Sequence, residues 1–74
     1  MNVVELLGAN MRHFRKLKGM TQEQLAMLVG MERSYFSNVE RGVRNPSVMV
    51  IARLAHSLNI EPHVLLLSRL SVSK

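Results

Sequence analysis

One face of residues 33–41 gathers polar side chains whose ends are suited to hydrogen bonding. At ~100° per helical residue, Phe36 and Val39 define the inner face of this segment, and the polar side chains fall opposite. Arginine can bridge O6 and N7 of guanine, and asparagine can pair with N6 and N7 of adenine, each contributing about 1–3 kcal/mol of base discrimination. An ordinary solvated face is the alternative, but such faces usually carry Glu and Lys. The sequence therefore predicts a DNA-reading face made of Arg33, Ser34, Ser37, Asn38 and Arg41.

The residues before this face have the composition of a helix and a turn that would position it. Thr21 can cap the amide of Gln24 while Gln24 reaches back, which is a capping box. Ala26 is small enough for a second helix to cross closely, and Gly30 tolerates the positive φ of a tight turn. Two helices joined in this way form a helix-turn-helix, whose second helix lies in the major groove. We predict this motif over residues 21–42, with residues 33–41 as its recognition helix.

Helix-breaking residues divide the chain into five segments of helical length. We expect helices over about residues 3–18, from 21 to the turn, over 33–41, from Ser47 onward, and from Pro62 through Leu67. Gly8 weakens the first helix by ~1 kcal/mol relative to alanine, unless close packing requires it. No segment alternates as a strand would, so the sequence predicts an all-α fold with one domain over residues 1–74. The fourth segment is expected to bury Val48, Ile51, Leu54, Ala55 and Leu58.

Composition and charge narrow the class of partner. Ten Lys and Arg against five Asp and Glu give the 74 residues a net charge of +5. Such a balance favours nucleic acid or an anionic membrane surface, but the apolar stretches are far shorter than the ~20 residues of a membrane span. Because the chain has no cysteine and residues 1–8 lack a secretory signal, we expect a cytoplasmic protein without disulfides.

No pattern of residues indicates catalysis or a bound small molecule. Aspartate is absent, and we find neither paired carboxylates nor a glycine-rich phosphate loop. His13, His56 and His63 lack the HxxxH or HExxH spacing of a zinc site. We therefore expect no enzyme, no metal, no cofactor and no small-molecule ligand.

The C-terminal part of the chain carries more apolar side chains than one short helix can bury. Ile60 and Leu65 can complete a core, with Leu54 and Leu58 from the segment before them. A core made of all the apolar residues is possible, but the excess favours a self-complementary dimer surface. We place a dimerisation region at about residues 48–70. Its expected contact residues are Met49, Val50, Val64, Leu66, Leu67 and Leu70.

With these motifs in place, the chain resembles the XRE family, the Cro and phage-repressor type of helix-turn-helix regulators. The likeness covers about residues 5–67. It rests on three segments: Leu7-Gly8 through Arg15, Gly19 through Ala26, and Val39-Glu40-Arg41-Gly42 through Ser47. Residues 33–37, Arg-Ser-Tyr-Phe-Ser, also look like the recognition helix of restriction–modification controller proteins, a subset of the family. The resemblance implies a compact five-helix, lambda-repressor-like domain that binds operator DNA as a homodimer.

The resemblance also implies roles for individual residues. Arg33, Ser34, Ser37 and Asn38 would contact base edges. Gln22 would hold a phosphate and brace the side chain of Arg33, and Tyr35 would lie beside the DNA backbone. Arg15 and Glu40 would form an ion pair between the first and third helices. Phosphates on the far side would be clamped by Arg41, Arg44 and the loop amides around Val43.

One position departs from the family pattern. Where Ser or Thr often caps the recognition helix, this chain has Glu32. Glutamate caps less well, although its charge favours a helix N-terminus. Because phosphates would repel it, we expect Glu32 either to orient Arg33 or to accept a hydrogen bond from a cytosine amino group.

The function that the sequence favours is a homodimeric transcriptional regulator that reads a palindromic operator in double-stranded DNA. One alternative is an antitoxin that represses its own operon and also binds a protein toxin. Another is a protein-interaction adaptor that uses the helix-turn-helix as a scaffold. The basic charge and the Arg and Asn face argue against the adaptor.

Overall fold

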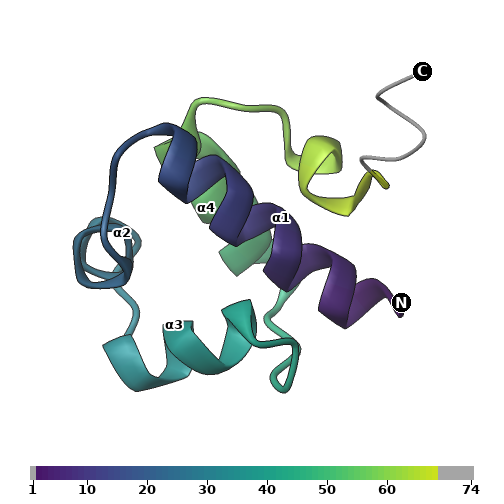
Figure 1. Ribbon diagram of the computed structural model, residues 1–74, viewed down its shortest axis with the longest axis horizontal. Helices are drawn as coiled ribbons and strands as arrows, with labels where there is room; N and C mark the ends of the chain where they lie inside the picture. The colour runs from purple at the N-terminus through teal and green to yellow at the C-terminus, as the bar shows by residue number, and fades with distance from the viewer. Residues whose placement is uncertain (1, 69–74) are drawn as a thin grey trace.

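The chain is helical through most of residues 2–68, which are the residues that the structure describes. In this computed structural model, four α-helices precede one short 3-10 helix, η1 (Figure 1). The elements are α1 (Val3–Leu17), α2 (Gln22–Leu28), α3 (Arg33–Glu40), α4 (Val48–Leu58) and η1 (Pro62–Leu66). The all-helical prediction is confirmed for residues 2–68, but the predicted fifth helix is a five-residue 3-10 helix. So short a segment suits 3-10 bonding, and the backbone is already extended at Leu67.

Side-chain caps fix where the helices begin. Thr21 Oγ1 accepts from the Gln24 amide at 3.1 Å, and Gln24 Oε1 accepts from the Thr21 amide at 2.9 Å, which confirms the predicted capping box. Ser47 caps α4 in the predicted way. A second capping box, at the start of α1, joins Asn2 to Glu5. These bonds satisfy amides that a helix N-terminus otherwise leaves unpaired.

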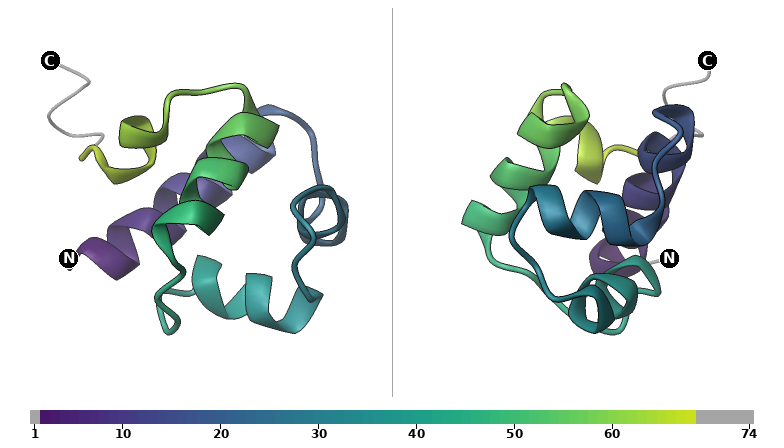
Figure 2. Two further views of the ribbon diagram at one scale, coloured as in Figure 1. Left: turned by 180° about the vertical axis from the view of Figure 1, so that it is seen from behind. Right: turned by 90° about the vertical axis from the view of Figure 1, so that its left-hand side faces the viewer.

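The core lies between α1 and the elements that it contacts, α3, α4 and η1, and α2 closes one side by packing against α3 and α4 (Figure 2). The expected burial of Val48 is wrong, since its side chain is 79% exposed. Val48 is the first residue of α4, one turn before Ile51, and the core covers only the later turns. No helix within residues 2–68 has the length and apolar character to span a membrane. The buried apolar residues are Leu7, Met11, Leu25, Ala26, Val29, Phe36, Val39, Leu54, Ala55, Leu58 and Leu65.

A close approach of two helices explains the glycine in the middle of α1. A Cβ atom at Gly8 would lie 2.4 Å from the carbonyl oxygen of Glu40 and 2.6 Å from that of Val39. Real Cβ atoms do not come so near to backbone oxygens, so α1 packs here because position 8 has no side chain. The close-packing alternative for Gly8 is thus confirmed, and α1 rests directly on the C-terminal end of α3.

Candidate nucleic-acid interface

A tight turn joins α2 to α3. Gly30 has a φ of 70°, and the amide of Met31 donates to the carbonyl of Ala26 at 2.9 Å. Ala26 itself is buried where the two helices meet. Figure 1 shows α2 almost end-on while α3 runs across the view, so their axes cross steeply. The geometry is that of a helix-turn-helix, with α3 as its second helix.

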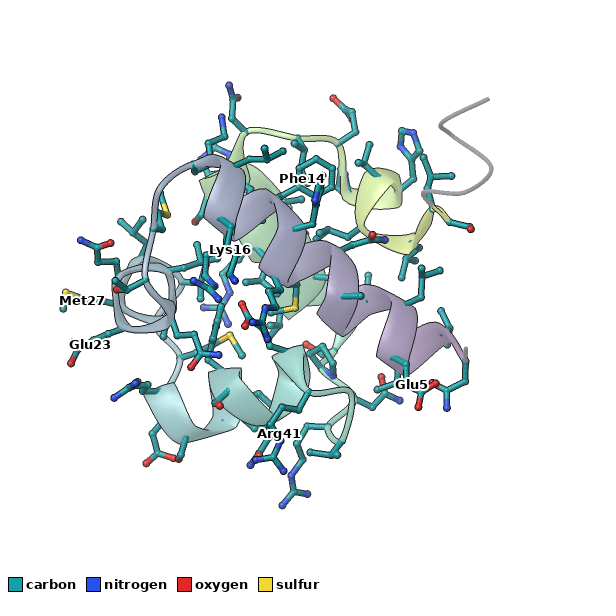
Figure 3. The ribbon with its side chains drawn as sticks, in the orientation of Figure 1. Glu5, Phe14, Lys16, Glu23, Met27 and Arg41 are labelled. Carbon is teal, nitrogen blue, oxygen red and sulfur yellow. The ribbon has the colours of Figure 1, made fainter. Side chains whose placement is uncertain are left out.

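The two sides of α3 differ sharply in burial. Phe36 and Val39 are fully buried, and Tyr35 is half-buried against the core. Arg33 and Ser34 are exposed, while Ser37 and Asn38 are half-exposed. Arg41 follows the helix and points away from the rest of the fold (Figure 3). The outward face defined by Arg33, Ser34, Ser37, Asn38 and Arg41 is therefore present on the folded molecule and is called the α3 face below.

The start of α3 lacks a side-chain cap. Glu32 occupies the N-cap position with extended backbone and makes no capping hydrogen bond. Its Oε1 instead accepts a hydrogen bond from the Ser34 hydroxyl at 2.8 Å. The glutamate thus orients Ser34, while its expected contact with Arg33 or with a cytosine amino group remains a prediction. No sequence pattern indicated the contact with Ser34, because two exposed residues so close in sequence have many alternative rotamers.

The C-terminal end of α3 is held by a Schellman arrangement. The amide of Gly42, with a φ of 79°, donates to Val39, and the amide of Val43 donates to Asn38, both at 3.0 Å. These are the two bonds of that motif. The Val43 amide is thus used within the protein, and the phosphate clamp by the loop amides around Val43 remains a prediction. Arg44, like Arg41, has an exposed side chain that can reach a phosphate.

A buried ion pair joins α1 to α3. Arg15 Nε lies 2.6 Å from Glu40 Oε2, and Arg15 Nη2 lies 3.2 Å from Glu40 Oε1. Arg15 also donates to the Met20 carbonyl at 2.8 Å, which ties in the loop before α2. Both residues are less than a tenth exposed. Removing one member of such a pair leaves a buried charge and costs about 3–5 kcal/mol.

Gln22 extends this network. Its Nε2 donates to Glu40 Oε1 at 2.9 Å, a contact that the family pattern did not imply, and its expected contacts with a phosphate and with Arg33 remain predictions. Gln22 and Arg33 nevertheless line the same hollow of about 550 Å³, together with Lys16. Two exposed cationic side chains, Lys16 and Arg33, therefore line the hollow that Gln22 also lines.

The proposed dimer residues do not form one group. Leu66 is 42% exposed and Leu67 39%, and Val64 is half-buried nearby on η1. Met49 lines a hollow with Leu28 on the α2 side of α4. Val50 packs against the core. Leu70 lies outside the described residues.

Asn10 is a buried residue that no sequence pattern indicated. Its Nδ2 donates to the carbonyls of Leu65 at 2.9 Å and Leu67 at 2.8 Å. The side chain is fully buried, and its Oδ1 has no partner among the described residues. Asn10 therefore fixes the backbone that carries Leu66 relative to α1.

The histidines serve packing or the surface. His13 meets Phe14 edge to face, with ring centroids 5.0 Å apart, and His56 and His63 are exposed. No three His or Glu side chains within residues 2–68 lie together in a way that could hold a metal ion.

Known proteins share this helix-turn-helix fold. A family model described as helix-turn-helix matches residues 11–65. The hypothetical transcription factor NHTF from Neisseria superposes with a TM-score of 0.89 at 38% identity, over 96% of this chain and 85% of its own. The restriction–modification controller protein C.AhdI from Aeromonas hydrophila superposes with a TM-score of 0.80 at 47% identity, over 84% of this chain and 94% of its own. SinR of Bacillus subtilis is a regulator of biofilm formation whose structure was solved in complex with DNA. It superposes with a TM-score of 0.77 at 33% identity, over 81% of this chain and 97% of its own.

Proposed function

This chain belongs to the helix-turn-helix family of XRE type, and we propose that it is a transcriptional regulator that binds a palindromic operator as a homodimer. The observation that carries the proposal is the division of α3 into a buried apolar side and a polar side, on which Arg33 and Ser34 are exposed and Ser37 and Asn38 are partly exposed. A net charge of +5 supports a polyanionic partner. Its family is one of DNA-binding regulators rather than enzymes.

In this proposal the α3 face lies in the major groove and reads base edges. Arg33 and Asn38 have the chemistry for bidentate pairing with guanine and adenine. The bond between Glu32 and Ser34 uses the hydroxyl proton of Ser34, so Ser34 meets the DNA as an acceptor. Its partner in the groove is then a donor, such as a cytosine or adenine amino group. Ser37 completes the base-reading set.

The remaining contacts are proposed to hold phosphates. Arg41 and Arg44 flank the C-terminal end of α3, while Gln22 lines a hollow together with Lys16 and Arg33. Tyr35 is proposed to lie beside the DNA backbone. Phosphate contacts fix the register of the protein on the duplex without reading its sequence.

Dimerisation is proposed through the surface around η1, where Leu66 and Leu67 are exposed. Two recognition helices one DNA turn apart would read an inverted repeat. We expect Leu66→Asp to give a folded monomer that binds operator much more weakly, as measured by sedimentation and by gel shift. The matched control is Val3→Asp, an exposed apolar residue on α1. An unchanged dimer mass for Leu66→Asp would contradict the proposed surface.

The salt dependence of binding to random duplex separates the proposal from a protein-interaction adaptor. Neutralised phosphates release counterions, so log affinity falls against log salt with a slope of about −0.9 per contact. We expect a slope that shrinks by about one in Arg44→Ala. A flat dependence, or no DNA binding, would favour the adaptor. An antitoxin would show the same slope, so this measurement does not separate it from a regulator that acts alone.

A further inference from the structure

Large apolar side chains lie exposed where the end of α2 meets α4. Met27 is 75% exposed, Leu28 62% and Met49 71%. They line two hollows, of about 480 Å³ and about 300 Å³, that meet at Leu28. Figure 2 shows α2 and α4 side by side in its right-hand view. We call the residues that line these hollows the α2–α4 face.

The α2–α4 face is separate from the α3 face. Figure 3 shows Met27 pointing to a different side of the fold from Arg41. Of the residues proposed to contact DNA, none lines either hollow. An occupant of the α2–α4 face would therefore leave the recognition helix free.

The charged residues that line these two hollows are basic. Lys18 lines one hollow, and Arg53 and His56 line the other, while no acidic residue lines either. Glu23, one turn before Met27 on α2, lies beside Met27 (Figure 3) but lines neither hollow. A second copy packed on this face about a two-fold axis would bring like charges together. Residues 69–74 contain Arg and Lys but no acid, so they do not complement it either.

The shape of the face suits a helix. An amphipathic helix repeats apolar residues at three and four positions, with Cβ atoms about 5–6 Å apart, so successive anchors can enter the hollows on either side of Leu28. Methionine side chains adapt to such anchors and are common at binding surfaces. We propose that the α2–α4 face binds an acidic amphipathic helix of a partner protein.

The test uses a synthetic helix of ~18 residues with Leu at helical spacing on one side and Glu on the other. Two matched peptides serve as controls: one with every Glu replaced by Lys, and one with the same composition scrambled. The full chain is labelled with ¹³C in its methionine methyl groups and with ¹⁵N in its backbone amides. We expect the acidic peptide to shift the Met27 and Met49 signals while the buried Met11 signal stays in place.

Variants of the chain test the two parts of the recognition. Leu28→Glu places a negative charge where the two hollows meet. The double substitution Lys18→Glu and Arg53→Glu reverses the charge of two basic residues that line them. Each variant is expected to bind the acidic peptide at least roughly tenfold more weakly than the parent chain, a loss that a titration resolves easily. Val3→Glu is the matched control, since Val3 is 59% exposed on α1, and its peptide affinity should equal that of the parent chain.

Five outcomes would overturn the proposal. The first is the absence of any Met27 or Met49 shift at about 1 mM acidic peptide. Equal binding of the lysine peptide would remove the charge argument. Shifts centred on Ser37 and Asn38 would show that the peptide mimics DNA. Concentration-dependent Met27 shifts without peptide would assign the face to a second copy, and stronger shifts with vesicles of anionic lipid would assign it to a membrane surface.

Discussion

The two ends of α3 are built in opposite ways. Its C-terminal end is closed by the Schellman turn at Gly42, by the ion pair of Glu40 with Arg15, and by the backbone contact with Gly8. Its N-terminal end begins at Glu32 without a side-chain cap, and Arg33 and Ser34 are exposed there. The fold thus fixes the C-terminal end of the helix, while the N-terminal end, where Arg33 and Ser34 are proposed to read bases, has no side-chain cap.

The largest effect is expected from breaking the closed end. Glu40→Gln removes the charge that Arg15 and Gln22 share, leaving the guanidinium buried without a counter-charge. We expect a loss of about 3–5 kcal/mol in the free energy of unfolding, measured by urea denaturation. The exposed Glu23→Gln is the matched control and should stay within about 0.5 kcal/mol of the parent. A Glu40→Gln loss as small as that of the control would mean that the pair does not position α3.

A smaller effect is expected from crowding the same end. Gly8→Ala places a methyl group against the carbonyls of Val39 and Glu40, so α1 must move away from α3. Overpacking costs about 1–3 kcal/mol, and the gain in helix propensity returns ~1 kcal/mol. Arg12→Ala, exposed on the same helix, is the control. If Gly8→Ala were more stable than the parent in thermal unfolding, the two helices would not be in direct contact.

At the uncapped N-terminal end of α3, a substitution is expected to raise the free energy of unfolding rather than lower it. Glu32→Ser supplies the cap that α3 lacks, so we expect a gain of about 1 kcal/mol in the free energy of unfolding. Thr21→Ala, which removes the existing cap of α2, should lose a similar amount. The Glu32→Ser substitution also frees the Ser34 hydroxyl to donate, so base preference at one position should change. Unchanged stability and unchanged preference together would place Ser34 outside the interface.

Much of this comparison was predictable, because the signals are local. The Thr21 capping box, the turn at Gly30 and the end of α3 at Gly42 each depend on residues a few positions apart. The polar side of α3 followed from the helical period that places Phe36 and Val39 inside. These features need no knowledge of how the helices pack.

The features that the sequence left undetermined depend on tertiary geometry. Asn10 donates hydrogen bonds to carbonyls more than fifty positions away in the sequence. The bond from Gln22 to Glu40 forms only when α2 packs against α3. Val48 continues the apolar period of α4 but lies before the core begins. Met49 fits the dimer pattern by composition, yet it lies on the α2 side of its helix.

The central claim is that the open end of α3 reads bases while the residues beyond its closed end hold phosphates. Selection of bound sites from a random duplex library tests it, with the parent chain, Arg33→Ala and Arg44→Ala run in parallel. The parent should select an inverted repeat. Arg33→Ala should lose preference at one position of each half-site, at a cost of about 1–3 kcal/mol, and Arg44→Ala should weaken all sequences alike. An Arg33→Ala variant that selects the same sites as the parent would contradict the account.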